Sequence, residues 1–331
     1  MVENLSVYES VKRWMTRLEK KSKSMDFSRS QTQRAALFWL KKYCIFLKTN
    51  PDQLIAERAR QVQEKNPTIK RQHEDYVESF VVSLKNEGYA PNSVAVAQGL
   101  ISSFYKASHV GLEEIDPVRV YNIRSFKVPQ VKDLKKMCAL AERDRDTALK
   151  AWILCQSESG LAIEDLLSLS WNQLSSEFGT IKRQMEKGIV PIHIEVRRQK
   201  TSERTDSFFG PNAISALKEY VADNGGSLNG KIFRMSIRSI QAKVKNIAIR
   251  SKVATVAFPI TPHKLRDFFN TYMKLAGVNE AIVERWMGHS IGKVRGAYLV
   301  TGKDDRVEGI PISKLAEVYM QAYPTIDITL A

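Results

Sequence analysis

Apolar residues recur every three or four positions along most of this chain, which is the spacing of amphipathic helices. In the first third of the chain, the predicted helices cover residues 31–48, 52–64, 69–86 and a segment that starts at residue 93. Farther along, they cover 131–158 and segments that start near residues 212, 238, 262 and 279. Between residues 179 and 209 apolar residues alternate with others, as at Val190, Ile192 and Ile194, and this period of two predicts strands joined in a hairpin.

The expected fold class is mainly α with a small antiparallel β-sheet, and a length of 331 residues favours two domains over one. The predicted segments are a basic helix and linker at 1–24, a helical domain at 25–116, a linker at 117–130 and a second domain at 131–331. A last amphipathic helix is predicted at about 311–323. Because so short a helix needs a partner surface, we expect it to dock either on its own domain or on another protomer.

The chain carries 51 basic and 36 acidic side chains, and the net charge of +15 is spread over both predicted domains. A polyanion such as DNA is the natural partner of such a protein. The first 24 residues are charged throughout, and no apolar run approaches the length of a membrane span. We therefore expect a cytoplasmic protein with no membrane contact.

The cysteines and glycines do not indicate a bound metal or nucleotide. Cys44, Cys138 and Cys155 are scattered in apolar helical stretches, so buried free thiols are predicted. The sequence has no Cys/His cluster with zinc spacing and no Gly-rich phosphate loop. No cofactor and no metal are expected.

The residues that can carry chemistry are concentrated between positions 261 and 298. His263 and Arg266 are three residues apart, so on a helix they lie on one face. Gly288-His289 follows a short amphipathic helix, and Tyr298 comes nine residues after His289. A His-x-x-Arg pair alone is more often a surface pair, and Gly-His alone more often ends a helix. The ordered set is the informative feature.

This ordered set resembles the signature of the tyrosine recombinase, or phage-integrase, family. Residues 145–171 are similar to the family's first conserved box, and residues 197–204 resemble the hairpin that presents its catalytic lysine, where Lys200 is the match. The tail at 322–324 resembles that of archaeal integrases of mobile elements. The resemblance implies a helical core-binding domain followed by a tyrosine-recombinase catalytic domain.

One position departs from the family pattern. The family has an arginine after Gly-Leu in the first box, whereas Gly160-Leu161 is followed here by Ala162. The resemblance then implies that one of two arginines that clamp the scissile phosphate is missing, by natural loss or deliberate substitution, and that activity is impaired. Asp165 matches an acidic residue that supports the family's site, and a carboxylate on a helix surface is the alternative interpretation.

The reaction that the resemblance implies is attack of a tyrosine oxygen on a DNA phosphodiester, which gives a 3′-phosphotyrosyl intermediate and a free 5′-hydroxyl. Tyr298 is the expected nucleophile, whereas the spacing of its rivals Tyr319 and Tyr323 favours packing. Because the pKa of tyrosine is about 10, the hydroxyl must be activated as it attacks. His263 is the candidate base.

The remaining candidates act on the phosphate and on the leaving group. Arg266 offers a planar fork to two phosphate oxygens, and His289 can donate a further hydrogen bond. Lys200 can protonate the departing 5′-oxygen, although a solvated lysine in a basic turn is the alternative. The covalent link retains the energy of the phosphoester bond, so the reaction needs neither nucleotide nor metal.

The expected function is that of a site-specific recombinase, an integrase that acts on double-stranded DNA attachment sites. The resemblance also implies a homo-oligomer on DNA, in this case a tetrameric synapse that exchanges C-terminal tails. Two other functions stay open. One is a recombinase-derived DNA-binding protein that has lost catalysis, and the other is a relaxing enzyme similar to the type IB topoisomerases.

Overall fold

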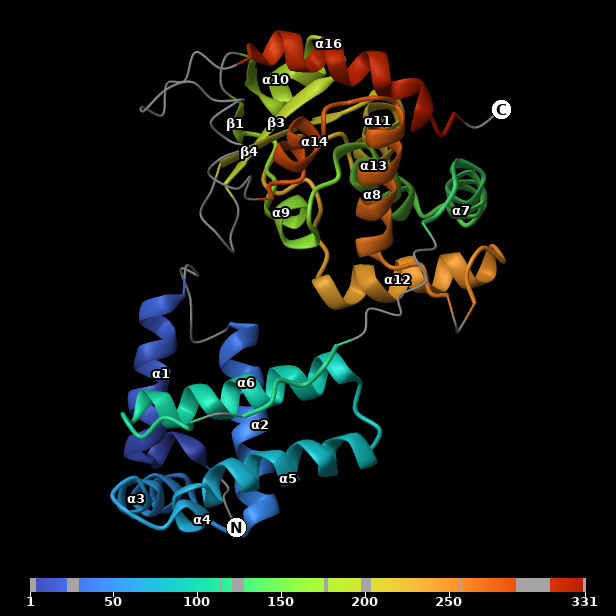
Figure 1. Ribbon diagram of the computed structural model, residues 1–331. Helices are drawn as coiled ribbons and strands as arrows, with labels where there is room; N and C mark the ends of the chain where they lie inside the picture. The colour runs from blue at the N-terminus through green and yellow to red at the C-terminus, as the bar shows by residue number, and fades with distance from the viewer. Residues whose placement is uncertain are drawn as a thin grey trace. The chain divides into compact units, whose positions relative to one another are not determined.

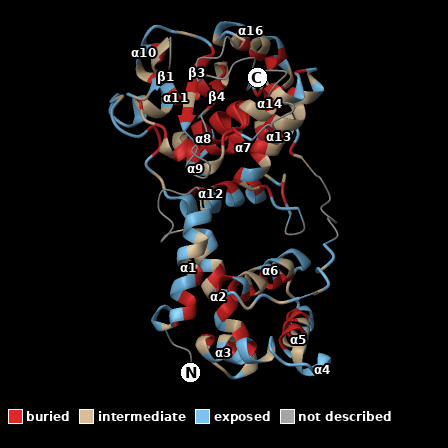
Figure 2. Ribbon diagram, turned by 60° about the vertical axis from the view of Figure 1, so that its left-hand side comes forward, coloured by how far each residue is buried: buried red, intermediate tan, exposed pale blue. Residues whose placement is uncertain are grey.

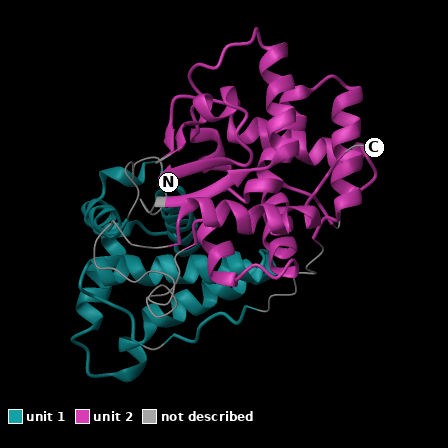
Figure 3. Cartoon of the chain, turned by 90° about the horizontal axis from the view of Figure 1, so that it is seen from above, with its two compact units in different colours: residues 1–125 teal, residues 126–331 magenta. Residues whose placement is uncertain are grey.

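The computed structural model describes residues 4–22, 30–113, 115–120, 128–175, 178–197, 204–255, 258–289 and 310–329. The chain divides into two compact units, residues 1–125 and 126–331 (Figure 3). Both units are built mainly from helices, and the described strands form two short antiparallel pairs. The predicted fold class, mainly α with a small antiparallel sheet, is confirmed.

Unit 1 is a bundle of helices around α6. Its described elements are η1 (Leu5–Val7), α1 (Glu9–Lys21), α2 (Gln31–Leu47), α3 (Pro51–Gln61), α4 (Pro67–Lys70), α5 (Gln72–Asn86) and α6 (Pro91–Ala107). Helix α6 packs against α1, α2 and α5 (Figure 1). The predicted basic helix and linker at 1–24 contributes α1, which shares the core of unit 1. Trp14 of α1 is fully buried, and its ring meets Phe104 of α6 edge-on at 5.4 Å.

Polar side chains fix the beginnings of two helices in unit 1. The hydroxyl of Ser30 accepts a hydrogen bond from the Gln33 N–H at 3.1 Å, so Ser30 caps α2. Asn50 caps α3 in the same way, with Pro51 at the first helical position. These are positions at which the sequence pattern alone predicts that a helix begins or ends.

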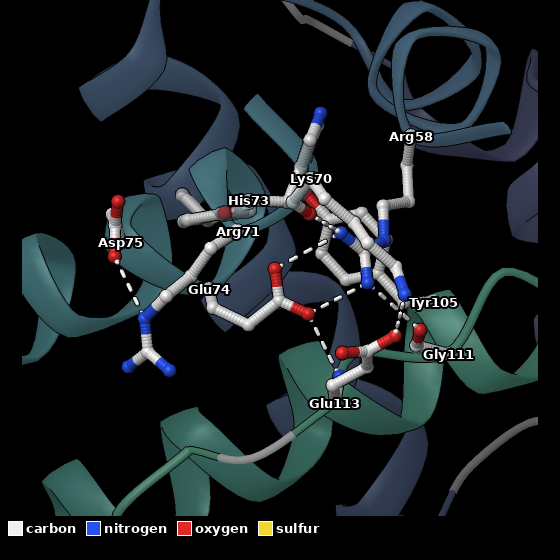
Figure 4. Close-up of polar contacts among 10 residues, drawn as sticks. Arg58, Lys70, Arg71, His73, Glu74, Asp75, Tyr105, Gly111 and Glu113 are labelled. Carbon is white, nitrogen blue, oxygen red and sulfur yellow. Dashed lines mark hydrogen bonds and ion pairs between the residues drawn. The ribbon is translucent and has the colours of Figure 1, made fainter. Parts of the chain in front are cut away.

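A buried ion pair joins the helices of unit 1 (Figure 4). Arg58 of α3 donates to both carboxylate oxygens of Glu74 on α5, at 2.9 and 2.6 Å, and each side chain is only 1% exposed. The same guanidinium donates to the carbonyl of Lys70 at 2.6 Å. Glu74 also accepts from the Glu113 N–H at 2.7 Å, which ties in the segment after α6.

Unit 2 is organised around helix α8, whose residues 149–159 are all buried (Figure 2). Its described helices are α7 (Val131–Arg143), α8 (Thr147–Ser159), α9 (Ile163–Ser168), α10 (Ile181–Glu186), α11 (Pro211–Asp223), α12 (Ile237–Arg250), α13 (Pro262–Leu275), α14 (Glu280–Trp286), α16 (Ile312–Ala322) and the 3₁₀ turn η4 (Tyr323–Thr325). Its strands are β1 (Leu174–Ser175), β2 (Gly179–Thr180), β3 (Ile192–Arg197) and β4 (Arg204–Phe209). Helices α7, α11 and α13 and strand β4 all pack on α8.

The predicted hairpin is present as β3 and β4, which pair antiparallel from Ile192 opposite Phe209 to Arg197 opposite Arg204. The alternating pattern suggested strands throughout 179–209, but residues 181–186 form α10 instead. Thr180 caps that helix through its hydroxyl. Helix α10 then covers β3, while α8 and α14 cover β4, which explains why the hairpin has few exposed positions.

The C-terminal helix α16 packs on its own unit. Tyr319 is fully buried, with ring centroids 5.2 Å from Phe208 of β4 and 5.7 Å from Trp286 of α14. Its hydroxyl donates to the Glu158 carbonyl at 2.9 Å, and the Tyr323 hydroxyl donates to the Glu158 carboxylate at 2.9 Å. We expected this helix to dock on another protomer. In this structure of one chain it takes the alternative position, because its own unit offers both an apolar surface and a buried acceptor.

Candidate active site

The structure describes five of the seven predicted site positions. Lys200 and Tyr298 lie outside the described residues. Of the other five, Arg266 and His289 are in direct contact with each other, and Ala162 lies close in sequence to a carbonyl that Arg266 binds. His263 and Asp165 are treated below.

Arg266 is the centre of this group. It comes from the first half of α13 and is only 4% exposed. Its Nη1 donates to the Gly160 carbonyl at 2.7 Å, and its Nη2 donates to the Met287 carbonyl at 2.6 Å and contacts His289 Nε2 at 2.8 Å. A single guanidinium thus joins the ends of α8 and α14.

A glycine is needed at the turn that offers the first of these carbonyls. Gly160 ends α8 with a φ of +63°, in the left-handed region that favours glycine. A Cβ at this position would lie 2.3 Å from the Phe269 ring, so a side chain would also collide with α13. The Gly-Leu turn therefore holds the chain in the one conformation that places its carbonyl against Arg266.

His289 is positioned by the end of α14. Gly288 has a φ of +64°, and the His289 N–H donates to the Glu284 carbonyl at 2.9 Å, which closes the helix. The His289 Nδ1 contacts the Glu284 carboxylate, which also accepts from Lys274 of α13 at 2.8 Å. Partial burial raises the pKa of Glu284, but the hydrogen bonds from Lys274 and His289 outweigh it and hold the pKa below its usual range.

His263 lies at the surface, in the first turn of α13. Its side chain is 69% exposed, and its Nε2 is 3.6 Å from the Asp267 carboxylate one turn along the helix. Arg266, three residues away, points into the unit and is buried. The exposed imidazole of His263 and the buried guanidinium of Arg266 therefore come from the same turn of α13.

Ala162 is the position at which we expected an arginine to be missing. Ala162 is the residue before α9, and the carbonyl that Arg266 binds is only two residues earlier in the chain. A longer side chain at position 162 would therefore start close to the Arg266 site. Asp165, one turn along α9, is 3% exposed, so the alternative of a carboxylate on the helix surface does not hold.

A second polar cluster, which the sequence analysis missed, fastens the hairpin to α14. Arg285 donates from Nε and Nη2 to the Asp206 carboxylate of β4 at 3.1 and 2.5 Å. The other oxygen of Asp206 is 3.1 Å from His193 Nε2 of β3, and the Thr205 hydroxyl donates to the Arg285 carbonyl. Polar residues inside an otherwise buried strand were the available signal for this cluster.

This cluster links two segments that carry predicted site residues. Burial raises the pKa of Asp206, but hydrogen bonds from His193 and Arg285 dominate and lower it, so the carboxylate is charged at neutral pH. Lys200 belongs to the connection between β3 and β4, and His289 follows α14. The Asp206–Arg285 pair therefore fixes strand β4 of the hairpin against the helix that precedes His289.

Tyr319 and Tyr323, the rival nucleophiles, serve as packing residues in this structure. Burial, with Glu158 nearby, raises the pKa of both hydroxyls far above the ordinary value. Both hydroxyls are also engaged as hydrogen-bond donors. Neither is available to attack a phosphate while α16 holds this position.

The described residues contain no group of His, Cys, Asp and Glu side chains that could hold a metal ion. Cys44, Cys138 and Cys155 are buried free thiols, as predicted. Among the helices of the described segments, none is both long and apolar enough to cross a membrane.

The family model described as the Phage integrase family matches residues 127–300, more than half of the chain. The chain belongs to the phage integrase family. Its match includes the Arg266–His289 pair, the Gly160 turn and the β3–β4 hairpin, together with the sequence positions of Lys200 and Tyr298.

Two relatives of this integrase-family chain match it at about a quarter sequence identity. It is 24% identical over 262 residues to the tyrosine recombinase XerC of Xanthomonas campestris pv. campestris (strain B100), a match that covers 74% of this chain and 72% of that protein. It is 25% identical over 211 residues to XerC of Xanthomonas axonopodis pv. citri (strain 306), where the chain spans 60% of the relative's length.

Solved structures show the same fold. A lambda integrase dimer bound to a COC′ core site matches with a TM-score of 0.51 and 16% identity, over 86% of this chain and 96% of that chain. The XerH recombinase bound to a palindromic difH substrate matches with a TM-score of 0.51 and 15% identity, over 77% and 73% of the two chains. These likenesses show that the chain has the fold of these recombinase structures.

Proposed function

We propose that this chain is a site-specific DNA recombinase that cleaves and rejoins DNA through a 3′-phosphotyrosyl intermediate. The observation that carries the proposal is the contact of Arg266 with Gly160, Met287 and His289 inside a phage-integrase domain. Through these contacts Arg266, on the His-x-x-Arg helix, binds both the Gly-Leu turn of the first box and the Gly-His turn. A guanidinium and an imidazole side by side are suited to bind a phosphate and to stabilise the charge of its transition state.

Each candidate residue has a proposed role. Arg266 and His289 bind non-bridging oxygens of the scissile phosphate, and Tyr298 attacks the phosphorus. His263 accepts the proton of the tyrosine, and Lys200 donates a proton to the departing 5′-oxygen. The Asp206–Arg285 pair supports this proposal because it ties strand β4 of the hairpin that carries Lys200 to the helix before His289.

Ala162 leaves the phosphate with one arginine fewer. Loss of one preorganised donor costs about 10²–10³ in rate in other enzymes. We therefore propose that the chain binds its DNA but cleaves it slowly. The same residue supports the second candidate function, a DNA-binding protein derived from a recombinase, and the two differ only in whether a covalent adduct forms at all.

Double-stranded DNA is the proposed partner. The net charge of +15 supports it, as do relatives named as tyrosine recombinases and structural neighbours described as bound to their DNA sites. We further propose that the chain assembles as a homo-oligomer on attachment sites. Exchange of α16 between protomers would require it to leave Glu158 and the apolar surface of its own unit, and the 20 residues at 290–309 supply the connection for that step.

The decisive experiment compares the chain with its Ala162→Arg variant. Duplexes that the protein binds are first selected from a random-sequence pool and then converted into nicked substrates that trap a covalent adduct. We expect similar binding by both forms and adduct formation about 10²–10³ times faster with Ala162→Arg. Equal rates would show that position 162 is not the empty arginine position.

The nucleophile is tested in the Ala162→Arg background. Tyr298→Phe should abolish the adduct and leave DNA binding unchanged, because only a hydroxyl is lost. Tyr272→Phe, on α13, is the matched control and should retain the adduct. An adduct that survives Tyr298→Phe would overturn the assignment, and the absence of any adduct in the Ala162→Arg variant would favour the DNA-binding protein without catalysis.

A further inference from the structure

His289 lies between a carboxylate and a guanidinium. Its Nδ1 contacts the Glu284 carboxylate, and its Nε2 is 2.8 Å from Arg266 Nη2. The His289 side chain is 44% exposed, so the ring borders solvent while Arg266 is buried beneath it. Both ring nitrogens therefore have a defined partner in the DNA-free chain.

The chemistry of these partners determines where the ring carries its proton. A guanidinium has only donors, so the Nε2 of His289 must accept the hydrogen bond from Arg266. A neutral imidazole has one N–H, which is then on Nδ1, and the carboxylate of Glu284 is the acceptor that this N–H requires. The arrangement thus selects the neutral ring with its proton on Nδ1.

A phosphate cannot be bound by His289 in that state. Phosphate oxygens accept hydrogen bonds, and an unprotonated Nε2 also only accepts. To donate from Nε2 the ring must gain a second proton from solvent and become an imidazolium. The Nδ1–H bond to Glu284 then becomes a pair of opposite charges, which is stronger than the neutral bond. The Arg266–His289 contact is lost, because both groups are now donors, and an anion oxygen can bind both of them.

We propose that binding of an oxyanion at this site is coupled to uptake of one proton from solvent by His289, and that Glu284 is the positioning residue for this change. Arg266 and Glu284 together select the Nδ1–H form of His289 in the free chain, and Glu284 stabilises the imidazolium in the complex. This inference rests on the proposed function for the identity of the anion, a DNA phosphodiester. The chemistry itself requires only a tetrahedral anion bound between Arg266 and His289.

In the described part of the chain, the charged groups on and around the helix before His289 come from α14 itself, from α13 and from β4. Helix α14 contributes Glu280, Glu284 and Arg285. Helix α13 contributes Arg266 and also Lys274, which donates to Glu284 at 2.8 Å and to Glu280 at 3.2 Å. Strand β4 packs on α14 and contributes Asp206, which is bound by Arg285. Glu284 is therefore the carboxylate that these contacts place on the His289 ring, whereas Glu280 shares Lys274 but is not in that contact.

The first test reads the proton position in the free chain. The chain has five histidines, so ¹⁵N NMR of the labelled imidazoles is tractable, and the His289→Asn variant identifies the signals of His289. At a pH where the ring is neutral, we expect a protonated Nδ1 and an unprotonated Nε2. Glu284→Gln should keep this form, since Arg266 still donates to Nε2 and the amide oxygen can accept from the Nδ1–H. A proton on Nε2 in the unaltered chain would overturn the proposal.

The second test adds sulfate, a tetrahedral anion that does not titrate near neutral pH, against chloride at equal ionic strength. We expect sulfate to raise the pH at which Nε2 of His289 becomes protonated by about one unit, a tenfold change in proton affinity. Glu284→Gln should lose most of this shift, while Glu280→Gln, which alters the same lysine contact, should keep it. Amide spectra of both variants show whether the fold is intact.

An unchanged titration of His289 in sulfate would overturn the proposal, and an undiminished shift in Glu284→Gln would remove Glu284 from it. Neither measurement uses DNA cleavage. If the proton moves as expected but the Ala162→Arg variant forms no adduct, the recombinase function fails and the anion site stands. If the adduct forms but the proton does not move, only this inference fails.

Discussion

A buried glutamate lies at a structural junction in each unit, and the two have different partners. In unit 1, Glu74 faces the Arg58 guanidinium, with hydrogen bonds of 2.9 and 2.6 Å (Figure 4). In unit 2, Glu158 accepts from the Ala213 N–H at 3.0 Å and from the Tyr323 hydroxyl at 2.9 Å, which are neutral donors. Both side chains are almost fully removed from solvent.

This difference in partners predicts different behaviour. The carboxylate of Glu74 lies against an opposite charge, and the pair joins α3 to α5 within the unit. For Glu158, burial raises the pKa to about 8, although the hydrogen bonds from Ala213, Tyr323 and Gly210 lower it in part. Unit 1 therefore contains a buried ion pair, whereas unit 2 contains a carboxyl group that changes charge near neutral pH and is bound by the tail segment through Tyr323.

Breaking the ion pair should have the largest effect. Arg58→Met leaves the Glu74 charge buried without its cation, and loss of one partner of such a pair costs about 3–5 kcal/mol. We expect the free energy of unfolding of unit 1, measured by urea denaturation, to fall by that amount. Arg71→Met is the control, because Arg71 pairs with Asp75 and Glu78 at the surface and should cost under about 1 kcal/mol. Equal effects of the two substitutions would contradict a special role for the buried pair.

The second prediction concerns the charge of Glu158. Its folded pKa is raised, so the folded state holds an extra proton between the unfolded pKa and about 8. The stability that this provides is full below the unfolded pKa and is lost as the pH rises through about 8. We expect the free energy of unfolding of unit 2 to decrease by about 1 kcal/mol per pH unit between pH 5 and 8.

Glu158→Gln should remove this slope, because an amide keeps hydrogen-bonding capacity but does not titrate. Glu317→Gln is the matched control on α16, since Glu317 is exposed and paired with Lys314, and it should leave the slope in place. Urea unfolding at several pH values gives the measurement. A slope that persists in Glu158→Gln would assign it to another group.

The sequence predicted the helices well and the polar contacts between distant segments poorly. The helical period located α2, α5 and α13 because a helix shows its apolar face in a local pattern. It gave no information on Glu158, whose partners Ala213 and Tyr323 are far away in the chain. Pairings of this kind depend on how helices pack, which a local pattern does not record.

In the candidate site, too, the local sequence pattern did not reveal a contact that depends on the fold. Arg266 and His289 were found because they belong to ordered motifs, and the structure brings them into contact. Glu284 was missed because, within the sequence, it is only one more acidic residue on an amphipathic helix. Its role becomes visible only when the turn at Gly288 brings His289 back over the end of α14.

The smallest predicted effect separates the two tail tyrosines. Tyr323→Phe removes the hydroxyl that donates to the Glu158 carboxylate and accepts from the Asn212 N–H at 3.1 Å. Two buried groups lose a partner, so we expect a loss of about 1–2 kcal/mol in the free energy of unfolding. Because the Tyr323 hydrogen bond lowers the pKa of Glu158, its removal should also extend the pH-dependent loss of stability to higher pH.

Tyr319→Phe is the matched comparison, since its hydroxyl donates to the backbone carbonyl of Glu158 and not to the carboxylate. It should cost a similar amount of stability and leave the pH dependence where it is. Urea unfolding of both variants from pH 5 to pH 9 distinguishes them. If the two variants showed the same pH dependence, the hydrogen bond from Tyr323 would have no part in setting the charge of Glu158. The pKa of Glu158 would then be set by its burial and its other hydrogen bonds, without a contribution from Tyr323.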